Sequence, residues 1–105
     1  MYLIVTRAFP PELGGMQSLM WGLSREMSKN YMIKVFADYH KDHKEFDDEA
    51  NFSIERVGGI KFLRKLRKAQ LINEFLKENK VKGIIADHWK SLELIQTEKK
   101  KYCLI

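Results

Sequence analysis

Cysteine is nearly absent from this sequence, since Cys103 is the only one among 105 residues. A lone cysteine excludes an intramolecular disulfide and leaves no cysteine pair for a metal site. No stretch approaches the roughly 20 apolar residues that a membrane-spanning helix needs. With 45% hydrophobic and 31% charged residues, the composition is typical of a folded globular chain and not of a disordered one. We therefore expect one folded domain, 1–105, in the cytoplasm.

Several signatures of nucleotide and metal chemistry are also missing. The sequence contains neither the G-x-G-x-x-G turn of dinucleotide-binding domains nor the G-K-[ST] end of a P-loop. Asp38 follows a glycine pair by about twenty residues, as the ribose-binding acid of a dinucleotide site does, but without the three-glycine turn we interpret this spacing as coincidence. The histidines and carboxylates of residues 38–51 match no metal-ligand spacing, so we interpret this segment as a solvated connection, with or without a short helix.

Basic residues outnumber acidic ones, 19 to 14, which gives a formal net charge of +5. This balance favours anionic partners such as phosphates or lipid head groups, although an ordinary basic surface explains it equally well. No nucleic-acid-binding motif is present, so we expect no nucleic acid partner.

Hydrophobic periodicity predicts alternating strands and helices. The expected strands are 2–6, 32–37, 52–57, 81–86 and 102–105, with 52–57 at an edge, and the expected helices are 16–27, 61–79 and 91–100. This alternation predicts an α/β fold: a Rossmann-like, doubly wound, mostly parallel sheet of about five strands with helices on both faces. In the expected strand order 3-2-1-4-5, the loops 7–15 and 87–89 meet where the winding reverses, which is where such sheets bind ligands.

The first of these loops ends in Gly14 and Gly15 directly before a helix. Backbone amides at a helix start attract anions, although an ordinary turn into a helix accounts for a glycine pair as well. The whole segment from Phe9 to Gln17, FPPELGGMQ, closely resembles the F-P-P-x-x-G-G-x-[EQ] segment after the first strand of family-4 glycosyltransferases of the GT-B fold. The resemblance implies that Gly14 and Gly15 face the diphosphate of a nucleotide-sugar donor. It continues more loosely through the following helix and strand, and is topological beyond Ala37.

The second loop belongs to the segment from Gly83 to Ser91, GIIADHWKS, which is similar to a strand-end segment that the family uses to contact the acceptor or the transferred sugar. The resemblance implies acceptor contacts by Asp87, His88 and Trp89, without deciding whether Asp87 or His88 holds the family's functional position. Arg7 is a further candidate from its position alone. Alternatively, Asp87 or Ser91 caps the next helix and Trp89 packs in the core.

The helix expected at 61–79 opens with the basic run KFLRKLRK. Lipid-directed enzymes of the family often dock on anionic bilayers through this domain, which makes Arg64, Lys65, Arg67 and Lys68 candidates for a membrane surface. Packing of the apolar side of the helix on the sheet explains the pattern without a membrane.

The resemblance implies an N-terminal, acceptor-side domain of a retaining glycosyltransferase. Such enzymes transfer a hexose from a nucleotide-diphosphate sugar to a glycan, lipid-linked or small-molecule acceptor, and generally need no metal or other cofactor, in keeping with the missing D-x-D pair. The family places the donor nucleotide and an E-x7-E pair of glutamates in a C-terminal domain, which we expect to be absent from 1–105, so we expect no sugar transfer by this chain alone. The alternative is a stand-alone flavodoxin-like binding or signalling module.

Overall fold

The computed structural model describes residues 1–96 and 101–104 of the chain. Within these residues, five parallel strands form one sheet in the order β3-β2-β1-β4-β5. This confirms the fold class and strand order predicted from the sequence, with β3 at an edge. The strands are β1 (Tyr2–Val5), β2 (Ile33–Asp38), β3 (Ser53–Val57), β4 (Gly83–Ala86) and β5 (Tyr102–Leu104).

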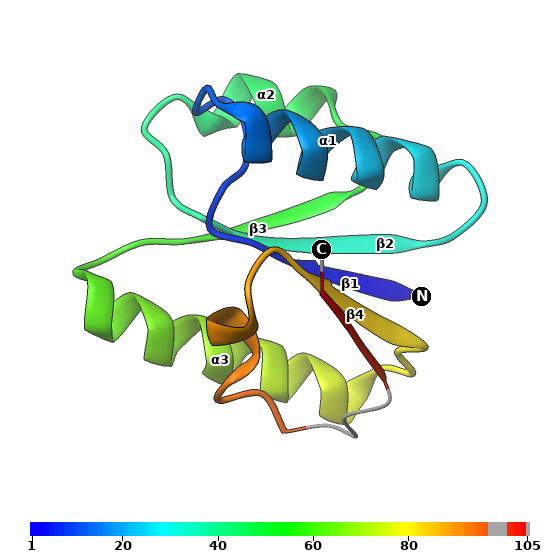
Figure 1. Cartoon of the computed structure of the whole chain (residues 1–105), viewed down its shortest axis with the longest axis vertical. Coiled ribbons are helices and arrows are strands. Elements are labelled where there is room, and N and C mark those ends of the chain that lie inside the picture. Colours follow the sequence, from blue (N-terminus) through cyan, green and yellow to red (C-terminus); the bar gives the residue numbers. More distant parts are fainter. Residues whose placement is uncertain (97–100, 105) are drawn as a thin grey trace.

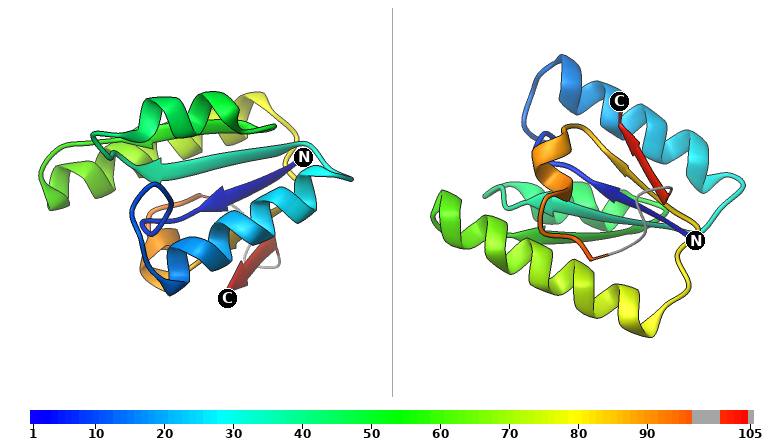
Figure 2. Two further views of the ribbon diagram at one scale, coloured as in Figure 1. Left: turned by 90° about the horizontal axis from the view of Figure 1, so that it is seen from above. Right: turned by 60° about the horizontal axis from the view of Figure 1, so that its bottom comes forward.

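Helices cover both faces of the sheet, as Figure 1 shows. One face carries α1 (Gly15–Ser28) and α2 (His43–Glu49), the short helix that the sequence left open. The other face carries α3 (Lys61–Glu78) and a 3-10 helix, η1 (Trp89–Leu92). The two views of Figure 2 show the same separation of α1 from α3 by the sheet. No helix among the described residues is long and apolar enough to cross a bilayer.

The predicted helix over residues 91–100 is wrong where the structure describes it. The helical conformation stops with η1, and residues 93–96 are not helical; residues 97–100 lie outside the described part of the chain. The cause is Asn73 of α3, whose side chain donates to Leu94 O at 3.0 Å and accepts from Gln96 N at 2.8 Å. These two contacts bind the chain to α3 in place of the hydrogen bonds that a longer helix would make within itself.

The side chains of β1 alternate between two cores. Leu3 and Val5 point into the core under α3 together with Phe36 and Ile72, whereas Ile4 points into the core under α1. All of these side chains are essentially inaccessible to solvent. Because period-two alternation places apolar groups on both faces of a central strand, β1 needs an uninterrupted apolar run, which the sequence supplies.

Candidate functional site

The loops after β1 and β4 meet at the carboxyl edge of the sheet. Asp87, directly after β4, accepts hydrogen bonds through Oδ2 from Thr6 Oγ1 at 2.9 Å and from Arg7 N at 3.2 Å. Its other oxygen, Oδ1, accepts from Ser91 Oγ at 3.1 Å. Asp87 therefore joins β1, β4 and η1, and both of its oxygens already have partners.

His88 lies beside this junction with its orientation fixed by the backbone. Its Nδ1 accepts a hydrogen bond from Lys90 N at 3.1 Å, which caps η1. An accepting Nδ1 leaves the proton of the neutral ring on Nε2, so the free side of the ring is a donor. Sequence reasoning named Asp87 or Ser91 as the capping residue, and this is wrong because the imidazole takes that role.

The exposed Trp89 side chain stacks on the ring of His88, with 5.8 Å between ring centroids and 29° between planes. The indole is 54% exposed, so the alternative in which Trp89 packs in the core is wrong. The sheet end here is already covered by η1 through Leu92, which is buried. Trp89 therefore presents an aromatic surface next to the junction.

The paired glycines lie at the exposed start of α1, with backbone amides unoccupied. Ser18 N donates to Gly14 O at 3.1 Å, and α1 has neither a side-chain cap nor an acidic residue in its first turn. The amides of Gly15, Met16 and Gln17 consequently have no partner within residues 1–96 and 101–104. Gly15 is exposed, and a Cβ on it would meet nothing within 4 Å.

A buried arginine that the sequence did not reveal holds this glycine loop in place. Arg56 of β3, with a side chain only 4% exposed, pairs with Asp47 of α2 at 2.8 Å. The same guanidinium donates to Pro10 O and, at 3.2 Å, to Asp38 O, and it lies 5.6 Å from the centre of the Phe9 ring. The alternating run 52–57 gave no signal for it, because its partners come from three distant segments.

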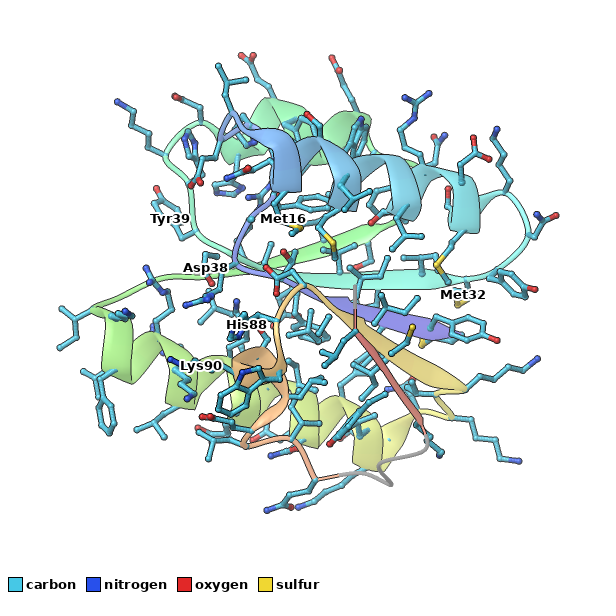
Figure 3. All side chains as sticks on the ribbon, viewed as in Figure 1. Met16, Met32, Asp38, Tyr39, His88 and Lys90 are labelled. Atoms are coloured by element: carbon cyan, nitrogen blue, oxygen red, sulfur yellow. The ribbon has the colours of Figure 1, made fainter. Side chains whose placement is uncertain are left out.

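On the opposite face of the sheet, a cleft of about 630 Å³ opens between the start of α3, the end of β2 and η1. Figure 3 shows Asp38, His88 and Lys90 at this end of the molecule and Met32 at the other. Most of the polar groups around the cleft are cationic. Its lining consists of Arg7, Asp38, Lys61, Phe62, Arg64, Lys65, Lys68, Ala69, Ile72, His88, Lys90, Ser91, Glu93 and Leu94.

Lys68 forms the inner wall of this cleft and is only 7% exposed. Its Nζ donates to Thr6 O at 3.0 Å and pairs with the Asp38 carboxylate. Burial lowers the pKa of Lys68, while the nearby Asp38 and Asp87 carboxylates oppose that shift. The prediction of Lys68 as a membrane-surface residue is therefore wrong, because its ammonium group points into the protein.

The other three basic candidates of α3 differ in their surroundings. Arg64 pairs with Asp38 at 3.3 Å, and Lys65 pairs with Glu93. Arg67 is exposed. The cationic groups of α3 thus divide between the cleft and the solvent, with Arg67 alone of the four free of an ion pair in the described part of the chain.

The first turns of α3 extend beyond the ends of the strands (Figures 1 and 2), so the apolar side chains there are not covered by the sheet. Phe62 is 69% exposed, and Leu63 and Leu66 are also exposed. Only from Ala69 onward does the apolar side of the helix pack on the sheet. The apolar side chains of α3 therefore follow one continuous pattern in the sequence, but those before Ala69 are exposed and Ala69 and Ile72 are buried.

Among the described residues, no group of three or more histidine, cysteine or acidic side chains is arranged to hold a metal ion.

Comparisons with protein-family models, curated proteins and solved structures found no match for this chain. The fold and the site together define a Rossmann-like α/β domain with a cationic cleft at the switch point of its sheet.

Proposed function

We propose that this chain is the N-terminal, acceptor-side domain of a retaining glycosyltransferase that uses a nucleotide-diphosphate sugar. The observation that carries the proposal is the junction at Asp87, which joins the loop containing the glycine pair to the loop containing His88. The sequence of both loops resembles family-4 enzymes, and both leave donors exposed at one edge of the sheet. That edge is where sheets of this topology bind ligands.

In this proposal the start of α1 receives the donor diphosphate. The amides of Gly15, Met16 and Gln17 have no partner among the described residues, and the helix dipole adds partial positive charge. The Gln17 side chain lies over Gly14 and its Nε2 donates to Glu12, so an anion at Gly14 has to displace it. The first turn of α1 itself contains no acidic residue, and the Glu12 carboxylate is bound to the side-chain amide of Gln17.

The acceptor or transferred sugar binds at the second loop. His88 lines the cleft, and its Nε2–H has no acceptor among the described residues and can donate to a hydroxyl, whereas Asp87 already accepts from three donors. This difference favours His88 over Asp87 as the direct sugar contact. Trp89 offers an exposed aromatic face, and Arg7 offers a guanidinium at the same edge.

The donor base and the E-x7-E glutamates belong, on this proposal, to a C-terminal domain outside residues 1–105. Sugar transfer by these 105 residues alone would contradict that assignment. The reading frame of the gene gives an independent check. A continuation of roughly 200 or more residues with a second alternating strand and helix pattern supports the proposal, given usual domain sizes, and a stop codon after Ile105 opposes it.

Docking on an anionic membrane is part of the same proposal. The exposed Phe62 and Leu63 lie on the turns that carry the basic run, a combination typical of helices that bind at bilayer interfaces. Serine at both positions should reduce sedimentation with vesicles of phosphatidylcholine and phosphatidylserine. Leu13→Ser, on the other face, is the control because Leu13 is even more exposed. Equal loss in both variants, or none in either, would remove membrane docking from the proposal.

The flavodoxin-like alternative is not supported by the strand order. Flavodoxin-like sheets have the order 2-1-3-4-5, whereas β3 of this chain lies at the edge beside β2. A stand-alone binding module of another kind would bind no nucleotide sugar at the glycine loop. The glycine amides therefore discriminate between the two functions.

The direct test is a titration of the isotope-labelled chain with UDP-glucose and GDP-mannose, followed by amide NMR. We expect shifts at Gly14, Gly15 and Met16 at millimolar ligand, and none with the corresponding nucleosides. Gly15→Asp should abolish them, because a carboxylate would replace the anion at the helix start. Gly22→Asp is the matched control: it lies in the same helix, and a Cβ there also meets nothing within 4 Å. Unperturbed glycine amides in the unmodified chain, or equal shifts in both variants, would contradict the proposal.

A further inference from the structure

The cleft beside α3 contains far more positive than negative charge. Six lysine and arginine side chains line it against two carboxylates, a formal excess of four positive charges with His88 neutral. These cations come from separate elements: Arg7 from the β1 loop, Lys90 from η1, and the others from α3. A solvated basic face on one helix does not account for this arrangement, because residues from three segments line one concave space.

Intramolecular ion pairs involve only some of the cations that line the cleft. Asp38 pairs with Arg64 and Lys68, and Glu93 pairs with Lys65. Within the described ranges, 1–96 and 101–104, the side chains of Arg7 and Lys61 have no hydrogen-bond or ion-pair partner, and Lys90 Nζ has only the Trp89 ring, 5.9 Å from its centroid.

The start of α3 lies beside the cleft, since Lys61 and Phe62 both line it. The helix is 18 residues long, has no side-chain cap and has no acidic residue in its first turn. The first intrahelical bond runs from Arg64 N to Ile60 O at 2.8 Å, so in the described residues the amides of Lys61, Phe62 and Leu63 have no partner. A helix dipole of this orientation favours an anion at the residues that line the cleft.

The remainder of the lining is apolar. Phe62, Ala69, Ile72 and Leu94 line the cleft together with the cations. A volume of about 630 Å³ lies within the usual range of roughly 300–1,000 Å³ for small-molecule sites. The cleft therefore suits a compound with one strongly anionic group and a less polar body, and not an inorganic anion alone.

We infer that this cleft binds the phosphate ester group of a phosphorylated small molecule, held by Arg7, Lys61 and the amides at the start of α3. The guanidinium of Arg7 matches two phosphate oxygens, and the Lys61 ammonium supplies a third donor. That this compound is the sugar acceptor rests on the proposed function; that the cleft binds a phosphate ester does not. The site is separate from the glycine loop, which lies on the other face of the sheet.

Calorimetric titration with glucose 6-phosphate, with glucose as the unphosphorylated control, tests this inference. We expect binding of the phosphate ester only. The double variant Arg7→Gln with Lys61→Gln should weaken it at least about tenfold, since each lost charge-assisted hydrogen bond contributes on that scale. Neither side chain has a partner among residues 1–96 and 101–104, so we expect the variant to retain the fold. The matched control, Arg67→Gln with Lys77→Gln, removes the same charge from exposed positions of α3 outside the cleft lining and should change affinity less than twofold.

The same variants separate a soluble ester from a lipid head group. Vesicles of phosphatidylcholine containing phosphatidic acid present the phosphate on a membrane; shifts at the Lys61 and Phe62 amides with these vesicles alone identify a lipid source and still support the site. Equal weakening by both double variants, or no binding to either form of phosphate, would overturn the inference. Shifts at Lys61 without shifts at Gly15 on adding a nucleotide sugar would leave the cleft intact and contradict the proposed function instead.

Discussion

At the carboxyl ends of the strands, the two faces of the sheet differ in how tightly they are packed. On the α1 side, the loop after β1 is packed by aromatic rings, with Phe9 6.0 Å from Trp21 and 6.1 Å from Phe46 between centroids, and is held by the buried Arg56. On the α3 side, the helix extends past the strands and a cationic cleft remains open. The packed α1 side, the closed face, holds the backbone of the loop after β1 in place. The α3 side, the open face, leaves a cleft with room for a ligand.

Lysine and arginine side chains have different surroundings on the two faces. Arg56 and Lys68 are both buried cations, yet Arg56 satisfies carbonyls and a carboxylate in a packed region, while Lys68 forms the wall of a cavity. Arg7 and Lys61 have no such partners in the part of the chain that the structure describes. Arg56 is therefore a structural cation, and a binding role for Arg7 and Lys61 is part of the inference drawn from the cleft.

The largest effect should come from breaking the closed face. Arg56→Ala removes the partner of Asp47 and leaves the carbonyl oxygens of Pro10 and Asp38 without their donor. Removing one member of a buried ion pair typically costs about 3–5 kcal/mol, and we expect a loss of that size in urea unfolding. Arg67→Ala, at an exposed arginine, should change stability by less than about 0.5 kcal/mol. Similar small losses for both variants would show that Arg56 does not hold the loop.

The next effect separates the two halves of α3. Ile72 is fully buried, whereas Leu63 is 52% exposed. Truncating a buried isoleucine to alanine costs about 2–5 kcal/mol, so Ile72→Ala should lower the free energy of unfolding by that amount. Leu63→Ala should be close to neutral, because its side chain loses little packing. Comparable losses measured by thermal or urea unfolding would mean that the start of α3 is packed in solution and the cleft is closed.

The strand order of the sheet was predictable from the sequence, but the burial of Arg56 and Lys68 was not. An apolar run in β1 and right-handed crossovers leave few possible strand orders, and the observed order is the expected one. The end of the helix expected at 91–100 depends on Asn73, a contact from another element that local periodicity cannot reveal. Burial of Arg56 and Lys68 depends likewise on partners far away in sequence.

The candidate site was predictable only at the level of its loops. The meeting of residues 7–15 and 87–89 follows from strand order, and Asp87 forms that contact. The roles of individual side chains depend on angles that a sequence does not fix: His88 caps η1, Asp87 bonds inward and Trp89 turns outward. Exposure of Phe62 depends on how far α3 extends past the strands, which periodicity alone does not determine.

An intermediate effect is expected at the junction between the two faces. Asp87→Ala loses three hydrogen bonds, which contribute about 0.5–1.5 kcal/mol each, so a total loss of about 1.5–4.5 kcal/mol should appear in urea unfolding. Asp87→Asn retains the shape: its oxygen can accept from Arg7 N and Thr6 Oγ1, and its amide can donate to Ser91 Oγ. We expect it to lose less than half as much. Equal losses would indicate that the negative charge, opposite Lys68, matters more than the bonds.

The smallest effect is a dependence of stability on alkaline pH. Because burial lowers the pKa of Lys68 below its ordinary value of 10.5, the folded chain releases this proton at a lower pH than the unfolded chain does. Between the two pKa values the unfolded state holds more protons, so stability rises with pH there, by at most about 1.4 kcal/mol per pH unit for one group.

The contribution of Lys68 is measured as the difference in free energy of unfolding between the unmodified chain and a Lys68→Met variant. The other lysines and the tyrosines are present in both chains. We expect the free energy of unfolding of the unmodified chain to gain on that of the variant as pH rises toward 10.5. Lys65→Met is the control, because it removes a lysine of the same helix whose side chain is 43% exposed and leaves Lys68 in place. A gain that shrinks with rising pH would mean that the Asp38 carboxylate outweighs burial and that Lys68 is held as a charged wall of the cleft throughout.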